Sequence, residues 1–435
     1  MKKDVSKVHL PHNKHTADCV SKVCLPPAEV FIPLKMHSGK EAEPVVNVGD
    51  QVKVGTLIAT CSEGNFAPVH SSVSGTVKAF EQVKVNGRMC NAIVIASDGK
   101  MEEDFVKPEE PKDLAEFLET VKASGCVGLG GAAFPTWSKL AAAQKAHIHT
   151  FLINGAECEP YLTSDYRTMM EKADYIASGI ALLKKYLGTE RFILGIESNK
   201  PEAIAALSER FKDDKAVEVT TLSTLYPQGA KQVLLYNTTG LVQKPGTRLA
   251  DLGVLIINMT SLATVAEYFA TGKPLVDRCV TVDGKMVKDP GNYVVPIGTP
   301  ISYVFEQAGG FSTDPAKVIV GGPMMGHAVE DLDEPVIKAT GGVIAFDEKE
   351  AKKNEPSPCI HCGKCVEACP LSLNPTEFAK AMRTEDLEER KAILDREQVN
   401  LCMQCGCCSY VCPAHRPLVQ TNVKAIGYLR SLNKR

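Results

Sequence analysis

The chain has 435 residues and a formal net charge of −3, and charged residues make up 23% of it. This length is enough for about three domains, and the near-neutral charge offers no basic surface for nucleic acid. The N-terminus lacks the apolar core of a signal peptide. The longest uncharged stretch, Gln398 to His415, is broken by cysteines and polar residues, unlike a membrane span. We expect no nucleic-acid partner and no transmembrane span, although the chain could lie on a membrane.

Residues 1–29 are predicted to form a polar, extended arm that contains three prolines. Within it, His12, His15 and Cys19 have a loose metal-ligand spacing. Because no fourth partner accompanies them, we interpret these three side chains as polar surface residues.

Residues 30–100 are predicted to form a β module, because short apolar runs alternate with glycine-containing turns. The sequence pattern V-x-V-G-D-x-V-x-x-G, followed by A-P-V-x-x-x-V-S-G-x-V, resembles that of proteins with the lipoyl-type barrel-sandwich fold. Carrier versions of this fold bear a prosthetic group on a lysine at a hairpin tip. No lysine occurs between Ile58 and Val69, so the sequence favours a structural or docking module over a swinging arm.

Residues 101–250 are predicted to form an α/β domain that follows an acidic linker, Met101–Asp113. Amphipathic helical patterns alternate there with apolar runs such as HTFLINGA and RFILGIES, which suit buried parallel strands. Residues 251–346 contain turn-separated strands and one short helix, as in a β-grasp module. The polar stretch Asp347–Pro358 then introduces a cysteine-rich region, residues 347–435.

A glycine-rich loop lies at residues 124–139, where Gly128, Gly130 and Ala133 satisfy G-x-G-x-x-[GA]. This signal is weak alone, and a helix precedes it where a Rossmann site has a strand. Glycines allow backbone N–H groups to approach a phosphate, the following helix start is electropositive, and Lys139 could add a charge. A plain tight turn remains the alternative, and Trp137 either shields a pocket or simply packs.

Two carboxylates, Glu157 and Glu159, flank Cys158 directly after an apolar strand. Side chains that follow a buried strand lie at the edge of a sheet, so this position favours a functional role over that of solvated loop charges.

Two cysteine runs near the C-terminus both have the spacing C-x2-C-x2-C-x3-C-P, which predicts two [4Fe–4S] clusters. A zinc site is less favoured, because zinc usually takes two C-x2-C pairs. The fourth cysteine of each run is expected to bind the other cluster. One predicted ligand set is Cys359, Cys362, Cys365 and Cys412, and the other is Cys402, Cys405, Cys408 and Cys369. Cys407 is interpreted as a free cysteine, and the scattered cysteines indicate a reducing compartment and no disulfide framework.

Several motifs resemble a known family. G-L-G-G-A-A-F-P-T-x-x-K resembles the flavin loop of the NADH-oxidising subunit of respiratory complex I and of RnfC, a component of the Rnf electron transport complex. I-N-G-A-E-C-E-P-Y-L-T-S-D-Y-R and I-N-M-T-S-L-A-T-V resemble two further segments. The module order and the paired cysteine runs favour RnfC over the complex I protein. The resemblance implies a multidomain α/β and α+β chain with a barrel-sandwich module, a Rossmann-like FMN/NADH domain, a β-grasp (SLBB-type) module and a helical double-cluster ferredoxin domain.

The resemblance also implies site residues. Gly128, Gly130, Gly131 and Lys139 would lie on the flavin phosphate side, and Asn154 and Asn258 would contact FMN polar groups. Glu157 would lie near the flavin ring, Glu159 would face the nicotinamide nucleotide, and Phe134 could stack on an aromatic ring. The chain departs from complex I at two places: Ala156 replaces an acidic residue, and Gly229–Lys231 align with a G-E-E triplet.

The function implied by the resemblance is electron transfer between NAD(H), FMN and the two clusters. Membrane and ferredoxin-type subunits of the complex would couple this transfer to ferredoxin and to pumping of Na+ or H+. The chain would lie peripherally on the cytoplasmic face of the membrane, and its amphipathic basic C-terminal segment, residues 423–435, either is solvated or docks there. Alternatives are a cobalamin reductase of bacterial microcompartments, which shares these parts, and a non-catalytic ferredoxin-like scaffold.

Overall fold

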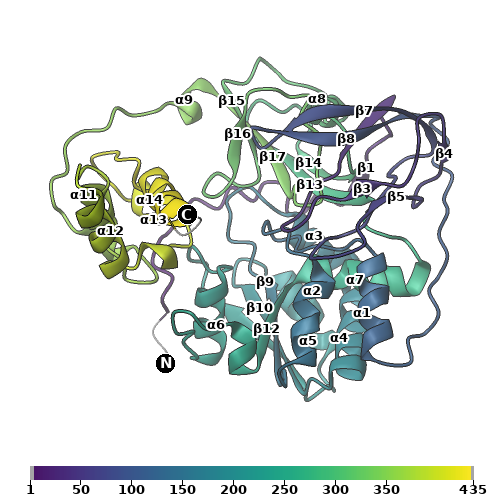
Figure 1. The fold of residues 1–435 in the computed structure, drawn as a ribbon, viewed down its shortest axis with the longest axis horizontal. Coiled ribbons are helices and arrows are strands. Elements are labelled where there is room, and N and C mark those ends of the chain that lie inside the picture. Colours follow the sequence, from purple (N-terminus) through teal and green to yellow (C-terminus); the bar gives the residue numbers. More distant parts are fainter. Residues whose placement is uncertain (1–3, 433–435) are drawn as a thin grey trace.

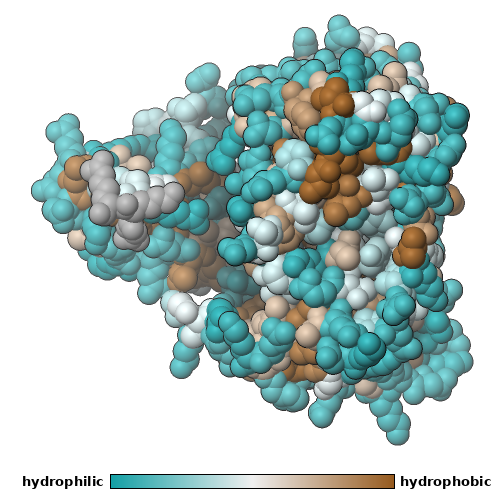
Figure 2. Space-filling model, turned by 45° about the vertical axis from the view of Figure 1, so that its right-hand side comes forward, coloured by the Kyte–Doolittle hydropathy of each residue, from teal (hydrophilic) through white to brown (hydrophobic). Residues whose placement is uncertain are grey.

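The computed structural model describes residues 4–432, which form a body of four β-sheets with flanking helices and a smaller helical lobe at the C-terminal end (Figure 1). A long segment carrying α9 (Glu348–Ala351) connects the body to this C-terminal lobe. Figure 2 shows the lobe projecting from the body, with a recess between the two. Within residues 4–432, no helix combines the length and the apolar character needed to span a bilayer.

The barrel-sandwich module consists of a four-stranded sheet of order β2-β8-β7-β4 and a three-stranded sheet of order β3-β5-β6. Alternate side chains of these strands fill one core, which includes Val30, Ile58 and Ile93. The long β7–β8 hairpin turns at Asn86 and Gly87, both with positive φ, as a tight two-residue hairpin turn requires. The strands are β2 (Glu29–Pro33), β3 (Glu43–Pro44), β4 (Gln51–Val52), β5 (Leu57–Thr60), β6 (Val69–His70), β7 (Gly75–Val85) and β8 (Arg88–Ser97).

The α/β domain is built on a parallel sheet of order β11-β10-β9-β12. Side chains of β9 alternate between two cores: Phe151 and Ile153 pack toward α1, α4 and α7, whereas Leu152 packs toward α6. The elements, in chain order, are α1 (Leu114–Ala123), α2 (Thr136–Leu140), η1 (Ala141–Gln144), β9 (Thr150–Gly155), α3 (Ser164–Glu171), α4 (Ala173–Leu187), β10 (Arg191–Glu197), α5 (Pro201–Arg210), β11 (Val217–Leu222), α6 (Lys231–Thr239), η2 (Leu249–Leu252), β12 (Val254–Asn258) and α7 (Met259–Thr271).

The α/β domain extends beyond residue 250, where we expected the β-grasp module to begin. β12 pairs with β9, and α7 packs against α4 and α3. The first four residues of VLIIN are apolar, and the strand lies at the edge of the parallel sheet, where it pairs with β9 and is buried along most of its length.

The β-grasp module has a six-stranded sheet of order β1-β14-β13-β17-β15-β16. Its edge strand β1 comes from the N-terminal arm and runs parallel to β14, so part of the predicted extended arm belongs to a sheet. The elements are β1 (Lys22–Val23), β13 (Asp277–Asp283), β14 (Gly291–Pro296), α8 (Ile301–Gln307), β15 (Lys317–Val320), β16 (His327–Val329) and β17 (Gly342–Phe346).

The C-terminal lobe is a small helical domain with its own core, which includes Phe378, Leu394 and Ile426. Helix α14 carries most of the predicted basic segment, and it turns Ala425, Ile426 and Leu429 into that core. Residues 433–435 of this segment lie outside the described residues. The lobe contains α10 (Lys364–Glu367), α11 (Pro375–Ala381), α12 (Leu387–Arg396), η3 (Val399–Leu401), α13 (Cys407–Tyr410) and α14 (Leu418–Leu432).

A buried lysine joins three modules. The ammonium group of Lys338, in the β-grasp module, donates to the carbonyl oxygen of Pro68 at 2.6 Å and to that of Gly125 at 2.8 Å. His70 lies beside this junction, and its Nδ1 has no hydrogen-bond partner within residues 4–432. Burial lowers the pKa of His70 to about 3, and the nearby charge of Lys338 acts in the same direction.

We predict that His70 makes the protein sensitive to acid. The unfolded chain protonates this imidazole below about pH 6.5 and the folded protein does not, so stability falls as the pH falls from 6.5 toward 3. At pH 5 the cost relative to pH 7 is about 2 kcal/mol, and His70→Gln removes it. Urea unfolding at both pH values, followed by the fluorescence of Trp137, the single tryptophan, measures this.

The matched control is His147→Gln, because His147 is an exposed residue of the same domain as Trp137. It is expected to leave the pH dependence of unfolding as in the wild type. Equal acid sensitivity of the wild type and His70→Gln would contradict the prediction.

Candidate functional site

Two asparagines end adjacent parallel strands. Asn154 and Asn258 pair directly, at the carboxyl ends of β9 and β12. The chain runs from β9 outward to β10 and β11 and then returns to the other side of β9 as β12, so the strand order reverses between these two asparagines. Ligands of open parallel sheets bind in the crevice outside such a switch point. The two asparagines therefore mark the position where a ligand is expected.

Each asparagine is held by its neighbours. The Asn154 amide nitrogen donates to the carbonyl oxygen of Gly229 at 3.0 Å. Asn258 caps helix α7 by accepting from the backbone N–H of Ser261 at 3.0 Å, and its amide nitrogen donates to Asp165 at 2.7 Å. The capping role fixes the Asn258 side chain at the sheet edge.

The glycine-rich loop lies over this edge. Its backbone closes on itself, because the N–H of Gly128 donates to the carbonyl oxygen of Phe134 at 2.8 Å. A Cβ added to Gly130 would lie 3.3 Å from the Asn258 amide nitrogen, and Gly131 has a φ of +101°. The N–H groups of Gly130, Gly131 and Ala132 have no hydrogen-bond partner within residues 4–432. Free N–H groups on such a loop form an anion-binding concavity, so the loop fits a phosphate.

Two lysines face this region without an anionic partner. Within the described residues, neither Lys139 on α2 nor Lys231 on α6 forms an ion pair or a hydrogen bond through its side chain. Burial lowers the pKa of Lys139, and the like charge of Lys231 lowers it further. A bound anion would relieve this repulsion. Lys231 replaces an acidic residue of complex I, and sequence reasoning did not assign it a role.

The carboxylate of Glu157 points toward helix α3. It accepts from the backbone N–H groups of Asp165 at 2.6 Å and Tyr166 at 3.2 Å, which belong to the first turn of that helix. Because Asp165 also accepts from Asn258, the predicted residues Gly130, Asn258 and Glu157 form one continuous chain of contacts. Burial raises the pKa of Glu157, while the positive charge of Lys14 opposes the shift.

Glu159 contacts the β-grasp module. Its Oε2 accepts from the N–H of Met324 at 3.0 Å in the β15–β16 turn, and a Cβ on Gly322 would overlap this carboxylate. Its Oε1 is buried and has no hydrogen-bond partner within the described part of the chain. Burial raises the pKa of Glu159. The side chain therefore connects the α/β domain to the β-grasp module in this structure.

The remaining predicted aromatic residues have separate environments. Phe134 is exposed by 37% at the end of the glycine-rich loop, where its ring is free to contact a ligand. Trp137 packs instead: its Nε1 donates to the carbonyl oxygen of Phe66 at 2.7 Å, and Lys122 lies over its ring.

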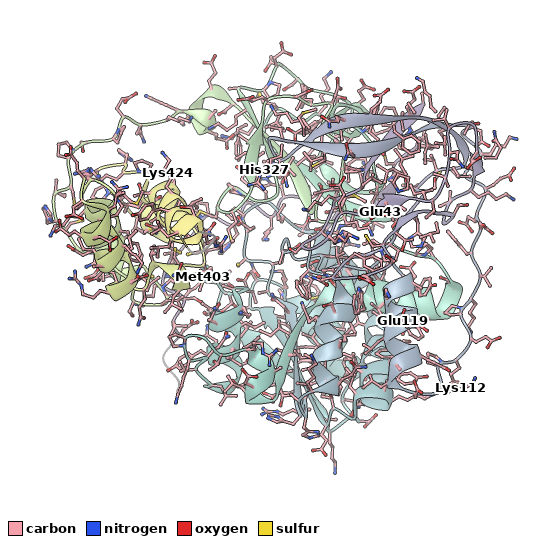
Figure 3. The ribbon with its side chains drawn as sticks, in the orientation of Figure 1. Glu43, Lys112, Glu119, His327, Met403 and Lys424 are labelled. Atoms are coloured by element: carbon pink, nitrogen blue, oxygen red, sulfur yellow. The ribbon has the colours of Figure 1, made fainter. Side chains whose placement is uncertain are left out.

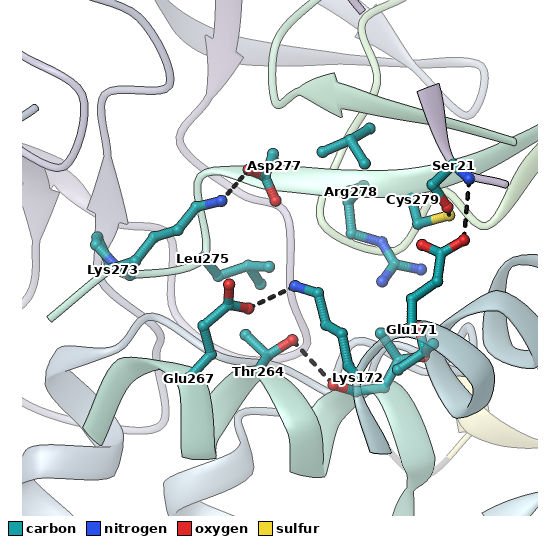
Figure 4. Close-up of a pocket in the computed structure, with 14 residues that line it drawn as sticks. Ser21, Glu171, Lys172, Thr264, Glu267, Lys273, Leu275, Asp277, Arg278 and Cys279 are labelled. Carbon is teal, nitrogen blue, oxygen red and sulfur yellow. Dashed lines mark hydrogen bonds and ion pairs between the residues drawn. The ribbon is translucent and has the colours of Figure 1, made fainter. Parts of the chain in front are cut away.

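Sequence reasoning missed several residues that hold this site. A cavity of about 60 Å³ lies between α3, α7 and β13 (Figure 4). Its ion pairs join Lys172 to Glu267 at 2.6 Å and Lys273 to Asp277 at 2.5 Å. The buried guanidinium of Arg278 projects into it and lies 3.5 Å from the carbonyl oxygen of Leu129, behind the glycine-rich loop. No local motif surrounds Arg278, so only the tertiary structure reveals this contact.

The eight predicted cluster cysteines gather around two cavities of the C-terminal lobe. One is lined by Cys359, Cys362, Cys365 and Cys412. The other is lined by Cys369, Cys402, Cys405, Cys407 and Cys408. Each cavity combines one triplet with the fourth cysteine of the other run. Within residues 4–432, no three His, Cys, Asp or Glu side chains lie close enough to hold a single metal ion.

The two cysteine runs share the same backbone. Positive φ angles occur in the first run at His361, Gly363 and Ser372. They recur in the second run 43 positions later, at Gln404, Gly406 and His415. Left-handed residues at matching places fold each triplet into the same loop, with its three cysteines turned toward one cavity. This internal repeat and the donor set of thiols fit a pair of equivalent cubic clusters.

The cavity of the second triplet lies next to the α/β domain. The Tyr226 hydroxyl donates to the carbonyl oxygen of Cys405 at 2.8 Å, and a Cβ on Gly406 would lie 3.1 Å from the carbonyl oxygen of Met324. Figure 3 shows Met403 at the edge of the lobe toward the α/β domain and Lys424 at its upper edge. The first triplet is more open, because Cys362 is exposed and a groove with Lys380, Arg383 and Arg416 adjoins it.

Four family profiles match the chain in the predicted order. They are described as the RnfC barrel sandwich hybrid domain (residues 6–100), the Nuo51 FMN-binding domain (121–267), the SLBB domain (279–328) and the 4Fe-4S dicluster domain (355–415). These matches confirm the predicted fold class and show that the chain contains an FMN-binding domain and a 4Fe-4S dicluster domain.

Curated relatives share most of their length with the chain. It is 39% identical to the C component of the "Proton-translocating ferredoxin:NAD(+) oxidoreductase complex" of Clostridium ljungdahlii, over 87% of this chain and 84% of the relative. It is 40% identical to the C component of the "Na(+)-translocating ferredoxin:NAD(+) oxidoreductase complex" of Acetobacterium woodii, over 86% of both chains. A solved NAD+-reducing [NiFe]-hydrogenase is similar in fold, with a TM-score of 0.51 and 20% identity over 74% of this chain and 62% of that chain.

Proposed function

The chain belongs to the RnfC family of components of ion-translocating ferredoxin:NAD+ oxidoreductase complexes, and from this premise we propose that it exchanges electrons between NAD(H) and partner subunits through FMN and two [4Fe–4S] clusters. The observation that carries the proposal is the position of the second cysteine triplet beside the α/β domain, which it contacts through Tyr226, and beside the β-grasp module, which it contacts through Met324. When bound, FMN supplies the conversion between two-electron and one-electron chemistry that a hydride donor and a cluster require.

We assign the FMN phosphate to the loop of Gly128, Gly130 and Gly131, with Lys139 and Lys231 as the neighbouring cations. The free N–H groups of the loop and the unpaired ammonium groups support this assignment. Asn154 and Asn258, at the switch point, would contact polar groups of the flavin. Phe134, exposed at the loop end, would stack on an aromatic ring of a bound nucleotide.

The nicotinamide side is assigned to the turn that carries Glu157 and Glu159. Glu157 reaches the flavin edge through Asp165 and Asn258. One carboxylate oxygen of Glu159, Oε1, has no hydrogen-bond partner among the described residues. The hydrogen bond that the other oxygen accepts from the N–H of Met324 must break before Glu159 can contact a nucleotide directly. We therefore propose that Glu157 contacts the bound flavin or nicotinamide and that Glu159 does so after this turn moves.

Electrons are proposed to enter the clusters at the second triplet. Cys405 and Cys407 pack in one apolar group with Tyr226, Cys158 and Met324, whereas Cys362 of the first triplet is exposed. This apolar group excludes water between the α/β domain and the lobe. The basic groove beside the exposed first triplet would then face the partner subunit that exchanges electrons with this chain.

Partner subunits are proposed to link this chain to ferredoxin, to move Na+ or H+, and to hold the chain on the cytoplasmic face of the membrane. The barrel-sandwich module offers a docking surface, because it exposes Val45, Val48, Phe80 and Met89. Apolar side chains gather on the upper part of the body in Figure 2, where Figure 1 places this module. Retention on membranes through a high-salt wash supports partner docking; complete release by salt would indicate lipid attraction alone.

Gly130→Val tests the flavin assignment. A branched side chain at this position meets Asn258 and fills the space above the switch point, so the variant is expected to keep both clusters and lose FMN. The wild type, purified without oxygen, is expected to contain one FMN whose absorbance NADH bleaches. Gly427→Val, on α14, is the control, because a Cβ there meets no atom within 4 Å. Stoichiometric flavin in Gly130→Val would place the site elsewhere.

Cys369→Ala tests the crossed cluster ligation. Cys369 lines the cavity of the second triplet, so its loss is expected to damage that cluster and leave the other intact. The iron content and the EPR spectrum of the reduced protein report which cluster survives. Cys407→Ala, in the same cavity, is the matched control and is expected to retain both clusters. Loss confined to the cluster of the first triplet would contradict the crossed arrangement.

A further inference from the structure

The N-terminal arm runs beside the C-terminal lobe and into the body, where it contacts the edge of the α/β domain (Figure 1). Val8 forms a β-bridge with Tyr226, and Asp4 accepts from Asn237 at 2.7 Å. Farther along, the hydroxyl groups of Thr16 and Thr163 lie 2.6 Å apart. The arm is therefore fixed on both sides of the segment that contains Lys14.

Lys14 contacts the turn that carries the two proposed functional glutamates. Its ammonium group donates to the backbone carbonyl oxygens of Glu157 at 2.8 Å, Glu159 at 2.9 Å and Leu162 at 2.5 Å. The N–H of Tyr161 in the same turn donates to the carbonyl oxygen of His12 at 3.0 Å. The three carbonyls satisfy all three N–H donors of one ammonium group.

The turn is in a conformation that its residues do not prefer. Glu157 has a φ of +49° and Tyr161 a φ of +69°, in the left-handed region that side chains with a Cβ rarely adopt. Such strain persists only when the surroundings fix the backbone. The ammonium of Lys14 draws three carbonyls of this turn toward one point, which stabilises the strained path.

The charge of Lys14 also matches the local electrostatics. Burial lowers the pKa of Lys14 to about 8, and the negative charge of Glu157 opposes this shift. Lys200 has its own partners, Glu197 at 3.3 Å and the carbonyl oxygen of Ala156 at 2.6 Å. Lys14 and, more weakly, Lys200 are thus the two cations whose charges favour the ionised form of the buried Glu157 carboxyl.

We propose that Lys14 is a positioning residue: from the N-terminal arm, its ammonium group holds the turn of residues 157–162 so that the Glu157 carboxylate stays on the first turn of α3, next to Asp165 and the proposed flavin edge. The expected effect of Lys14 on NADH binding rests on the proposed function, whereas the position of Lys14 on the turn rests on the contacts of the arm. The arm is thus part of the redox site, although it precedes the α/β domain by about 100 residues of chain.

Lys14→Met removes the charge and the three donors and keeps the length of the side chain. Hydrogen bonds from a charged donor are stronger than those between neutral groups, so amide hydrogen exchange in residues 157–163 is expected to rise at least about tenfold when all three are lost. FMN content is expected to stay at the wild-type level, because the glycine-rich loop is separate from Lys14. The dissociation constant for NADH is expected to rise by about tenfold.

Lys7→Met is the matched control, because Lys7 lies in the same arm and is exposed. It is expected to change neither exchange nor NADH binding. Wild-type exchange of residues 157–163 in Lys14→Met would overturn the proposal. If that variant does not fold, Lys14→Gln, which removes the charge and keeps a neutral N–H donor, takes its place, and exchange in residues 157–163 is expected to rise by a smaller factor. Absence of flavin from the wild type would instead contradict the proposed function, and hydrogen exchange would still decide the role of Lys14.

Discussion

The reversal of strand order between β9 and β12 is the constraint on which the rest of the site depends. It opens a crevice at the carboxyl edge of the sheet, and every proposed flavin contact is an element that reaches this edge. The glycine-rich loop covers it from α1, Asn258 caps the helix that leaves it, and Glu157 closes it through the first turn of α3. The second cysteine triplet contacts the same domain through Tyr226, which places it beside the proposed flavin site.

Lysine ammonium groups hold the irregular segments around this edge. Lys14, Lys200 and Lys338 each donate to backbone carbonyl oxygens of loops that have no strand or helix partner. A loop carbonyl that is buried without a partner costs free energy, and an ammonium with three donors satisfies several at once. The modules of the chain are therefore joined to the site by buried polar contacts as well as by apolar packing.

Local patterns in the sequence predicted the module order and the cysteine spacing, because both depend on short stretches of chain. The resemblance to RnfC predicted Asn154 and Asn258, which the structure places side by side at the ends of β9 and β12. The contacts of Lys14, Arg278 and Lys338 were not predictable, because each joins segments more than 100 residues apart. The end of the α/β domain was also missed, since a single apolar strand carries no signal for the sheet it joins. The nicotinamide contact of Glu159 stays a prediction.

We propose that FMN binds at the edge between β9 and β12, and a structure of the protein reconstituted with FMN tests this proposal most directly. It predicts the phosphate on the N–H groups of Gly130 and Gly131, close to Lys139, with the flavin ring over Asn154 and Asn258. Flavin bound away from this edge, with those N–H groups still free, would contradict the central claim.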